Sequence, residues 1–146
     1  MKLQKDLKEF LELLNSHKVE FVIVGGHAVA FHGYPRYTGD IDFFVRPELE
    51  NARRIIKVME AFGFNDIGVK AEDFTSPNRI IQLGYPPNRI DLITSISGCD
   101  FDEVWDSRSE SKLDGVPVSF IGKESLIKNK QASGRGKDLI DVEKLR

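Results

Sequence analysis

The sequence has few of the features that would tie it to a special environment. Among its 146 residues there is one cysteine, Cys99, which rules out an internal disulfide. With no signal-peptide pattern at the start, this predicts a cytoplasmic protein. No stretch approaches the roughly 18 consecutive apolar residues of a membrane span, so we expect no contact with a membrane core. There is also no repeat, low-complexity tract or linker, and residues 1–146 are expected to form one domain.

The chain has no excess of positive charge overall, but its charge is unevenly distributed. The formal net charge is −2, which does not favour a protein that coats nucleic acid. Residues 123–146, however, carry seven Lys or Arg against four Asp or Glu, so a mildly basic segment follows an acidic body. Such a segment could face a polyphosphate, and it could equally be a solvated helix.

The hydrophobic pattern predicts a mixed α/β (α+β) fold. Apolar runs rich in β-branched and aromatic residues predict about five strands, at residues 19–24, 40–45, 79–83, 89–93 and 116–121. Apolar residues at helical spacing predict helices at residues 3–14, 27–32 and 49–62, followed by two more that start near Lys123 and Lys137. Asp114-Gly115 is expected to form a tight turn before the last strand. Hairpins beside helix-linked strands imply a mixed sheet with helices packed on it.

Two carboxylates in the second predicted strand indicate a cation site. Asp40 and Asp42 are two residues apart, so both side chains should point to one face, while Ile41 and Phe43 point into a core on the other. Two like charges this close on a half-buried strand are unfavourable unless a cation lies between them. Magnesium prefers such carboxylate oxygens. A D-x-D pair alone is a weak signal.

A pair of glycines precedes these acids. Gly25-Gly26 comes at the end of the first predicted strand and at the start of a short helix. A backbone without Cβ atoms lets a ligand approach, and amide groups at a helix start favour phosphate. An isolated Gly-Gly is more often only a tight turn, but here it is one short helix away from the acids.

A third acid interrupts a later apolar strand. Asp91 lies among Ile90, Leu92 and Ile93, where an unpaired carboxylate is costly. Arg89 is expected to point to the other face of the strand and to be a poor partner. If this strand lies beside that of Asp40, the three acids form one site. Three acids that hold two magnesium ions suit phosphoryl or nucleotidyl transfer.

These motifs together resemble a known family. Gly25-Gly26, the Asp40-Ile41-Asp42 segment and a later strand acid resemble the nucleotidyltransferase fold of the DNA polymerase β superfamily. The segment VIVGGHAVAFHGYPRYTGDIDFFV is similar to minimal, single-domain nucleotidyltransferases related to AbiEii toxins and to antitoxin-like members of that group. The closing GRGKDLIDVEKL resembles their R-x-K-D-x-x-D helix.

The resemblance implies a role for each motif. Magnesium, as two ions, would be held by Asp40, Asp42 and Asp91, and a triphosphate would lie at Gly25 and Gly26. Further nucleotide contacts are expected from one residue pair before the D-x-D and from basic residues near the end, namely Arg36, Thr38, Lys128, Lys130, Arg135 and Lys137. Asp138 and Asp141 are expected to form ion pairs or to cap a helix rather than to bind a ligand.

Two functions from different classes follow from the sequence. The first is an enzyme that moves a nucleoside monophosphate from a nucleoside triphosphate to an acceptor hydroxyl on a protein, an RNA or a small molecule. The second is an antitoxin-like or regulatory binding partner, associated with a toxin or another protein, with little or no catalysis of its own. The presence of all three acids favours the first. His27, His32 and Cys99 are expected to have structural roles only.

Overall fold

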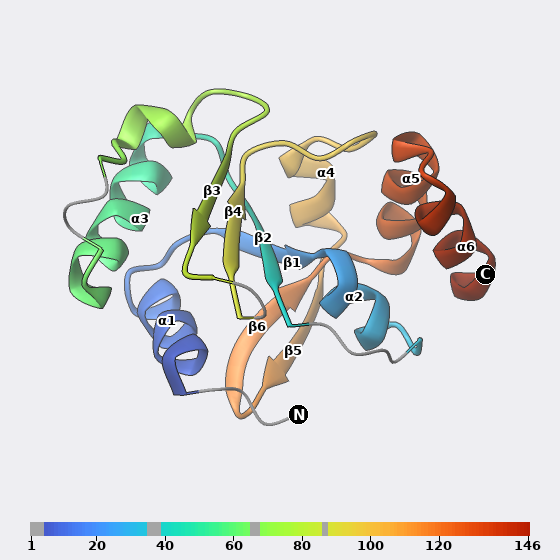
Figure 1. The fold of residues 1–146 in the computed structure, drawn as a ribbon, viewed down its shortest axis with the longest axis horizontal. Coiled ribbons are helices and arrows are strands. Elements are labelled where there is room, and N and C mark those ends of the chain that lie inside the picture. The colour runs from blue at the N-terminus through green and yellow to red at the C-terminus, as the bar shows by residue number, and fades with distance from the viewer. Residues whose placement is uncertain (1–4, 35–38, 65–67, 86–87) are drawn as a thin grey trace.

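A computed structural model describes residues 5–34, 39–64, 68–85 and 88–146 of the chain (Figure 1). Its helices are α1 (Lys5–Ser16), α2 (Gly25–Phe31), α3 (Leu49–Phe62), α4 (Phe101–Asp106), α5 (Lys123–Ser133) and α6 (Gly136–Leu145), with a short 3-10 helix η1 (Ala71–Phe74). Its strands are β1 (Phe21–Val24), β2 (Ile41–Val45), β3 (Ile80–Leu83), β4 (Ile90–Ile93), β5 (Ser109–Leu113) and β6 (Val116–Phe120). In the described ranges, none of the helices has the length and apolar character needed to cross a bilayer.

The six strands form one mixed sheet in the order β3-β4-β2-β1-β6-β5. The central strand β2 pairs antiparallel with β1 and parallel with β4. Antiparallel hairpins β3–β4 and β5–β6 close the two ends of the sheet. The mixed sheet with packed helices was predicted from the sequence and is confirmed, with six strands instead of about five.

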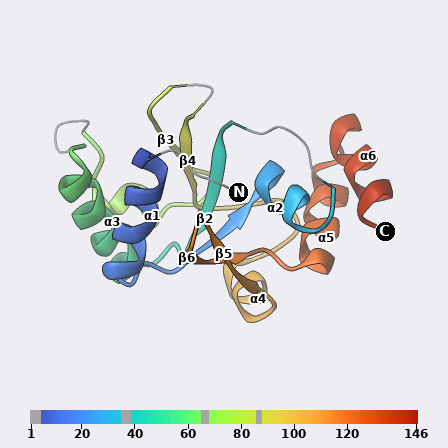
Figure 2. The same ribbon diagram turned by 90° about the horizontal axis from the view of Figure 1, so that it is seen from below.

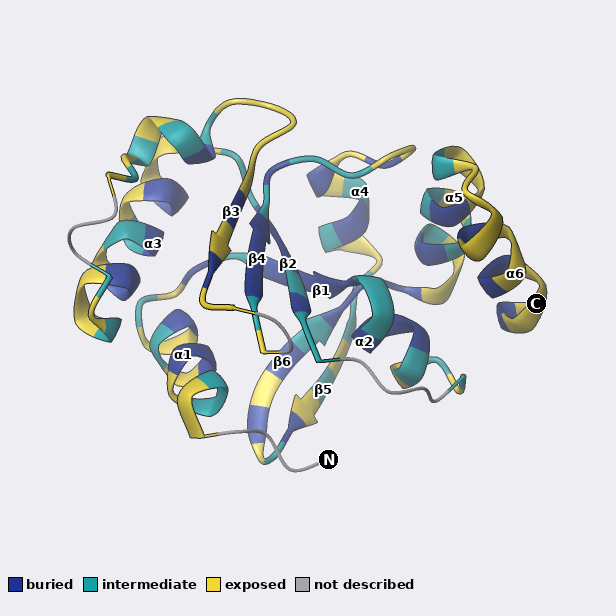
Figure 3. Ribbon diagram, in the orientation of Figure 1, coloured by how far each residue is buried: buried dark blue, intermediate teal, exposed yellow. Residues whose placement is uncertain are grey.

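The additional strand is β5, and its sequence explains why it was not predicted. Ser109–Leu113 reads SESKL, which lacks β-branched and aromatic residues, and at the edge of the sheet all its residues except Leu113 are exposed or half-buried (Figure 3). The strand forms because the predicted turn at Asp114-Gly115, where φ is +49° and +80°, folds it back onto β6. Helix α4 was also not predicted. Its start is stabilised by reciprocal hydrogen bonds between Asp100 and Glu103.

Neighbouring residues of β2 pack on opposite faces of the sheet. The Phe43 ring lies 6.2 Å from that of Phe10 on α1, which in turn meets Phe62 of α3 at 5.3 Å. On the other face, Phe44 lies 5.0 Å from Phe101 of α4. Burial of each such ring contributes about 1.5–3 kcal/mol. Figure 2 shows α1 and α3 on one side of the central strands and α2, α5 and α6 on the other.

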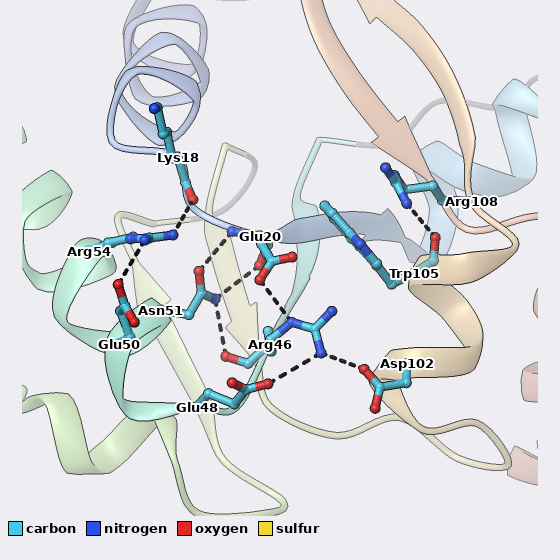
Figure 4. A network of polar contacts seen from close by, with 10 residues as sticks. All are labelled: Lys18, Glu20, Arg46, Glu48, Glu50, Asn51, Arg54, Asp102, Trp105 and Arg108. Atoms are coloured by element: carbon cyan, nitrogen blue, oxygen red, sulfur yellow. Dashed lines mark hydrogen bonds and ion pairs between the residues drawn. The ribbon is translucent and has the colours of Figure 1, made fainter.

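A polar network holds the far end of β2, just after the strand (Figure 4). Arg46 donates hydrogen bonds to Glu20 at 3.0 Å and to Asp102, and its guanidinium lies 4.6 Å from the Phe101 ring centre. The buried amide of Asn51 bonds the backbone on both sides, at Glu20 and Arg46. These contacts join β1, β2, α3 and α4, so the position of β2 is fixed at the end opposite to Asp40.

Candidate functional site

Asp42 and Asp91 lie side by side on neighbouring strands. They are register partners in the parallel pair β2–β4, so their side chains share one face of the sheet. Asp40 lies two residues before Asp42, immediately ahead of β2. These three residues, called the acid triad below, are therefore neighbours at one end of β2 and β4. Ile41 and Phe43 are buried on the opposite face, as expected.

The triad contains an unfavourable concentration of negative charge. The pKa of Asp42 is raised to about 6, first by burial and then by the charge of Asp91, hydrogen bonding to Asp91 and the charge of Asp40. Arg89 only partly offsets this effect. A carboxylate perturbed in this way by like charges is typical of sites that bind a cation or handle protons.

Arg89 is part of the site, which corrects the expectation that it would point away. It lies two residues before Asp91, and residues two apart on a strand share a face. Its Nε donates to Asp91 Oδ1 at 2.7 Å and its Nη2 to Asp91 Oδ2 at 3.1 Å. Its backbone N–H donates to Asp40 Oδ1 at 2.9 Å. The R-x-D spacing carried this signal in the sequence.

The backbone of Gly25, which carries no side chain, lies directly beside the Asp42 carboxylate. Its φ is +71°, and a Cβ at this position would lie 2.2 Å from Asp42 Oδ2. Glycine is therefore required here both by conformation and by the carboxylate beside it. Gly25 and Gly26 are themselves the first residues of α2, rather than a turn that precedes it. Because α2 has only seven residues, the half-buried glycine backbone of this segment matters more than any dipole of the helix.

A polar pocket of about 370 Å³ surrounds these groups. It is lined by glycine backbone, the acid triad, Arg89 and residues of the α5–α6 segment, namely Gly25, Gly26, Gly39, Asp40, Asp42, Arg89, Asp91, Lys130, Arg135, Lys137 and Asp138. Of the predicted nucleotide contacts, Lys130, Arg135 and Lys137 thus lie on its wall. Gly39, Arg89 and Asp138 were not predicted to do so.

Three predicted contacts are not among the lining residues. Lys128 is outside the pocket, where its Nζ pairs with Glu103 of α4 at 3.0 Å. Arg36 and Thr38 lie outside the described residues. The pocket therefore has an acidic floor from β2 and β4 and a basic wall from the start of α6 and the end of α5.

A buried ion-pair cluster fixes that basic wall. Lys130 is only 6% exposed, and its Nζ lies 3.0 Å from an oxygen of Asp138 and 3.0 Å from an oxygen of Asp141. Asp138 also accepts hydrogen bonds from Ser133 and Arg135, both at 2.6 Å. The two acids thus form ion pairs, as expected, and they hold Lys130 and Arg135 in place beside the pocket.

The donor set fits a hard divalent cation. Carboxylate oxygens are the ligands that magnesium prefers, and the like-charge repulsion at Asp42 would be relieved by a cation. Within the described ranges, no three acidic, histidine or cysteine side chains already converge on one metal position. The guanidinium of Arg89 provides positive charge at this place, with its Nε 2.7 Å from Asp91 Oδ1.

The histidine and cysteine that could suggest other chemistry have structural contacts. His32 Nε2 donates to the backbone oxygen of Ile121 at 2.7 Å, which ties the end of α2 to β6. The Cys99 thiol is buried and its pKa is raised by that burial. Neither lines the pocket.

A mixed sheet with a D-x-D strand, a partnering acid on the next strand and a glycine pair defines a nucleotidyltransferase-fold protein. The family model described as "Nucleotidyltransferase of unknown function (DUF6036)" matches residues 1–145. The chain therefore belongs to this nucleotidyltransferase family. Among curated proteins, no sequence matches the chain.

Solved structures share the fold at low sequence identity. A "putative nucleotidyltransferase" from Thermotoga maritima superimposes with a TM-score of 0.64 at 17% identity, covering 94% of this chain and 88% of the other. The lincosamide antibiotic adenylyltransferase LnuA gives 0.57 at 18%, covering 99% and 96%. The antibiotic-resistance factor ANT(2'')-Ia gives 0.61 at 14%, covering 96% and 80%. The likeness spans the full pocket-bearing domain.

Proposed function

We propose that this protein is a magnesium-dependent nucleotidyltransferase that moves a nucleoside monophosphate from a nucleoside triphosphate to an acceptor hydroxyl. The observation that supports it most is the direct pairing of Asp42 with Asp91 on adjacent parallel strands, against the bare backbone of Gly25. Family membership supports the reaction class. Asp40, Asp42 and Asp91 are the proposed metal ligands.

Each part of the pocket has a task in this reaction. The magnesium ions, when bound, would neutralise phosphate charge and orient attack. The acceptor oxygen would form a bond to the α-phosphorus while the bond to the β-phosphate oxygen breaks, which releases pyrophosphate. The acceptor proton would pass to a carboxylate of the triad, for which Asp91 is the proposed base. Gly25 and Gly26 would line the approach of the phosphates.

The basic wall would hold the triphosphate tail. Lys130 and Lys137 line the pocket opposite the acids, and Arg135 lies close enough for the charge of Asp42 to raise its pKa, after the larger effects of Asp138. Phosphate oxygens between an acidic floor that holds cations and a wall of side-chain cations would meet positive charge on both sides. We therefore propose Lys130, Arg135 and Lys137 as phosphate contacts.

The acceptor is proposed only as a hydroxyl. Among proteins of the same fold, LnuA is named a lincosamide antibiotic adenylyltransferase, and ANT(2'')-Ia is described in complex with adenylyl-2''-tobramycin. This supports a small-molecule acceptor as one candidate beside RNA and protein. Incubation with each α-labelled nucleoside triphosphate, magnesium and either a cell lysate or a panel of hydroxylated compounds tests the proposal. We expect label transfer with release of pyrophosphate, and loss of both in Asp42→Asn.

The alternative, an antitoxin-like or regulatory partner, makes a different prediction in the same assay. It would give no transfer to any acceptor, no pyrophosphate, and equal behaviour of wild type and Asp42→Asn. Transfer that persists undiminished in Asp42→Asn would contradict the assignment of the triad.

A further inference from the structure

Arg89 is the cation that lies directly against two members of the triad, Asp40 and Asp91. Its guanidinium engages both oxygens of Asp91, at 2.7 and 3.1 Å, and its Nη2 lies 3.6 Å from Asp40 Oδ2. The Asp91 side chain is only 9% exposed, so water has little access to replace these bonds. The arginine is therefore the resident counter-ion of the acids.

This pairing opposes metal binding by the same oxygens. Magnesium would need a carboxylate oxygen at about 2.0–2.1 Å, and a guanidinium fork on that carboxylate would repel it strongly at such range. A cation would therefore bind Asp91 more tightly once Arg89 has released one of its oxygens. A released guanidinium is costly to leave unpaired in a partly buried pocket.

A triphosphate would remove that cost. Arginine forms forked, charge-assisted hydrogen bonds with phosphate as readily as with carboxylate. When metal and triphosphate arrive together, the Asp91 oxygens would exchange the guanidinium for the metal, and the guanidinium would exchange Asp91 for phosphate. When the free metal arrives alone, Arg89 would gain no new partner.

We propose that Arg89 is an exchangeable counter-ion of the acid triad, which makes free metal bind weakly and couples metal entry to the triphosphate. This rests on the proposed function, because it assumes that the triad binds metal and nucleotide. Arg89 is then a positioning residue: it keeps Asp91 paired until substrate is present and afterwards holds phosphate.

The test uses the variant Arg89→Gln and Mn²⁺ as the metal probe. Binding of Mn²⁺ is measured by electron paramagnetic resonance or calorimetry. Free Mn²⁺ should bind about tenfold more tightly than to wild type, because a positive charge has been removed beside the ligands. ATP in the presence of saturating Mn²⁺ should bind about tenfold more weakly, because a phosphate contact is lost. Damage to the fold would weaken both.

Two further variants and a melting experiment sharpen the result. Arg89→Lys keeps the charge without the fork, so its Mn²⁺ affinity should lie between those of wild type and Arg89→Gln. Arg79→Gln removes a surface pair with Asp73 at the start of β3 and should leave both affinities unchanged. Without metal, Arg89→Gln should have a lower melting temperature than wild type. Added Mn²⁺ should raise the melting temperature of Arg89→Gln by more than it raises that of wild type.

Unchanged or weaker binding of free Mn²⁺ by folded Arg89→Gln would overturn this proposal. Asp42→Asn in the same titrations separates the two levels of inference. If Asp42→Asn loses metal-dependent ATP binding while Arg89→Gln leaves Mn²⁺ affinity unchanged, only the counter-ion role fails. If Asp42→Asn binds Mn²⁺ and ATP as tightly as wild type does, both the counter-ion role and the proposed function fail.

Discussion

Single residues in the triad show a conflict between stability and the proposed chemistry. Asp42 has a raised pKa, so the folded protein binds its proton more tightly than the unfolded chain does. This favours the fold while Asp42 is protonated, and the benefit is lost as the pH rises from the unfolded value near 4 through about 6. At neutral pH, an ionised Asp42 therefore destabilises the metal-free protein.

Asp42→Asn should consequently stabilise the metal-free fold while abolishing magnesium-dependent triphosphate binding. The amide is isosteric, removes one like charge and can donate to Asp91. We expect a gain of about 1 kcal/mol, or roughly 3 °C in melting temperature in EDTA at pH 7.5. Asp106→Asn, at an exposed position on α4, is the matched control and should change neither property. A destabilised Asp42→Asn would contradict the charge argument.

Gly25→Ala should separate backbone strain from damage to the site. At φ +71° an alanine costs about 1 kcal/mol, and its Cβ would also force the Asp42 carboxylate to turn away. Gly115→Ala has the same kind of strain, at φ +80°, with no atom within 4 Å of the new Cβ. In urea titrations Gly25→Ala should lose at least as much stability as Gly115→Ala, and only Gly25→Ala should lose nucleotide binding. Normal binding by Gly25→Ala would exclude a role for this backbone contact.

The sequence could identify most of these residues but not their partners. Asp40 and Asp42 were predictable because alternation along a strand is a local property. Asp91 was recognisable as an acid in an apolar strand, but its position beside Asp42 depends on which strands pair. Its pairing with Arg89 was local, and R-x-D on one strand predicts it once both residues are counted on the same face.

Among the elements, the α5–α6 pair buries a charged cluster beside the apolar side chains of Leu126, Val142 and Leu145. The mean hydropathy of the whole chain is −0.29, and α5 buries only Leu126 and Lys130. Lys130 lies between Asp138 and Asp141, so one cation replaces part of the apolar contact between the helices. Removing one partner from such a buried cluster is costly because the others stay buried without it.

Lys130→Met should therefore destabilise the protein by about 3–5 kcal/mol, because two buried acids lose their shared cation. Lys128→Met is the matched control on the same helix, where an exposed pair with Glu103 contributes at most about 1 kcal/mol. Urea unfolding followed by circular dichroism measures both. Equal stabilities of the two variants would show that the buried cluster contributes no more than a surface pair.

The same cluster predicts a loss of stability in acid. Burial alone would raise the pKa of Asp138, but hydrogen bonds from Arg135, Ser133 and Lys130 outweigh it and lower the pKa well below the usual range. A carboxylate with a lowered folded pKa stabilises the fold above its unfolded pKa, near 4, and this is lost as the pH falls further. The urea midpoint should drop steeply below pH 4 in wild type and less steeply in Asp138→Asn. If the urea midpoints of wild type and Asp138→Asn fell equally steeply below pH 4, Asp138 would not be the cause of the loss of stability in acid.

The predictability of an element depends on how much of its structure is local. Helix α3 begins and ends at the predicted residues, because its apolar period and the glycine at its C-terminal end, Gly63 at φ +101°, are both readable. Strand β5 could not be predicted, since its composition is polar and only its pairing with β6 makes it a strand. Tertiary pairing decides such edge strands.

For the whole molecule, the strand order includes a parallel pairing of β4 with β2 that the sequence alone could not predict. The chain passes from β2 through α3 and the β3 hairpin strand before β4 returns to lie parallel beside β2. Local patterns predicted the strands but not this return, which brings Asp91 next to Asp42. Strand β2 runs from the triad, which lies at its start, to the Arg46 network, which lies just after its last residue.

The pocket wall also constrains when the protein can become competent during its synthesis. Its contributors extend along the chain from Gly25 to Asp138, and Lys130 stays without its second acid until Asp141 has been made. A ribosome-bound nascent chain that stops short of α6 would present the acids and the glycines without the basic wall opposite them. The proposed chemistry therefore requires that α6 has already been synthesised.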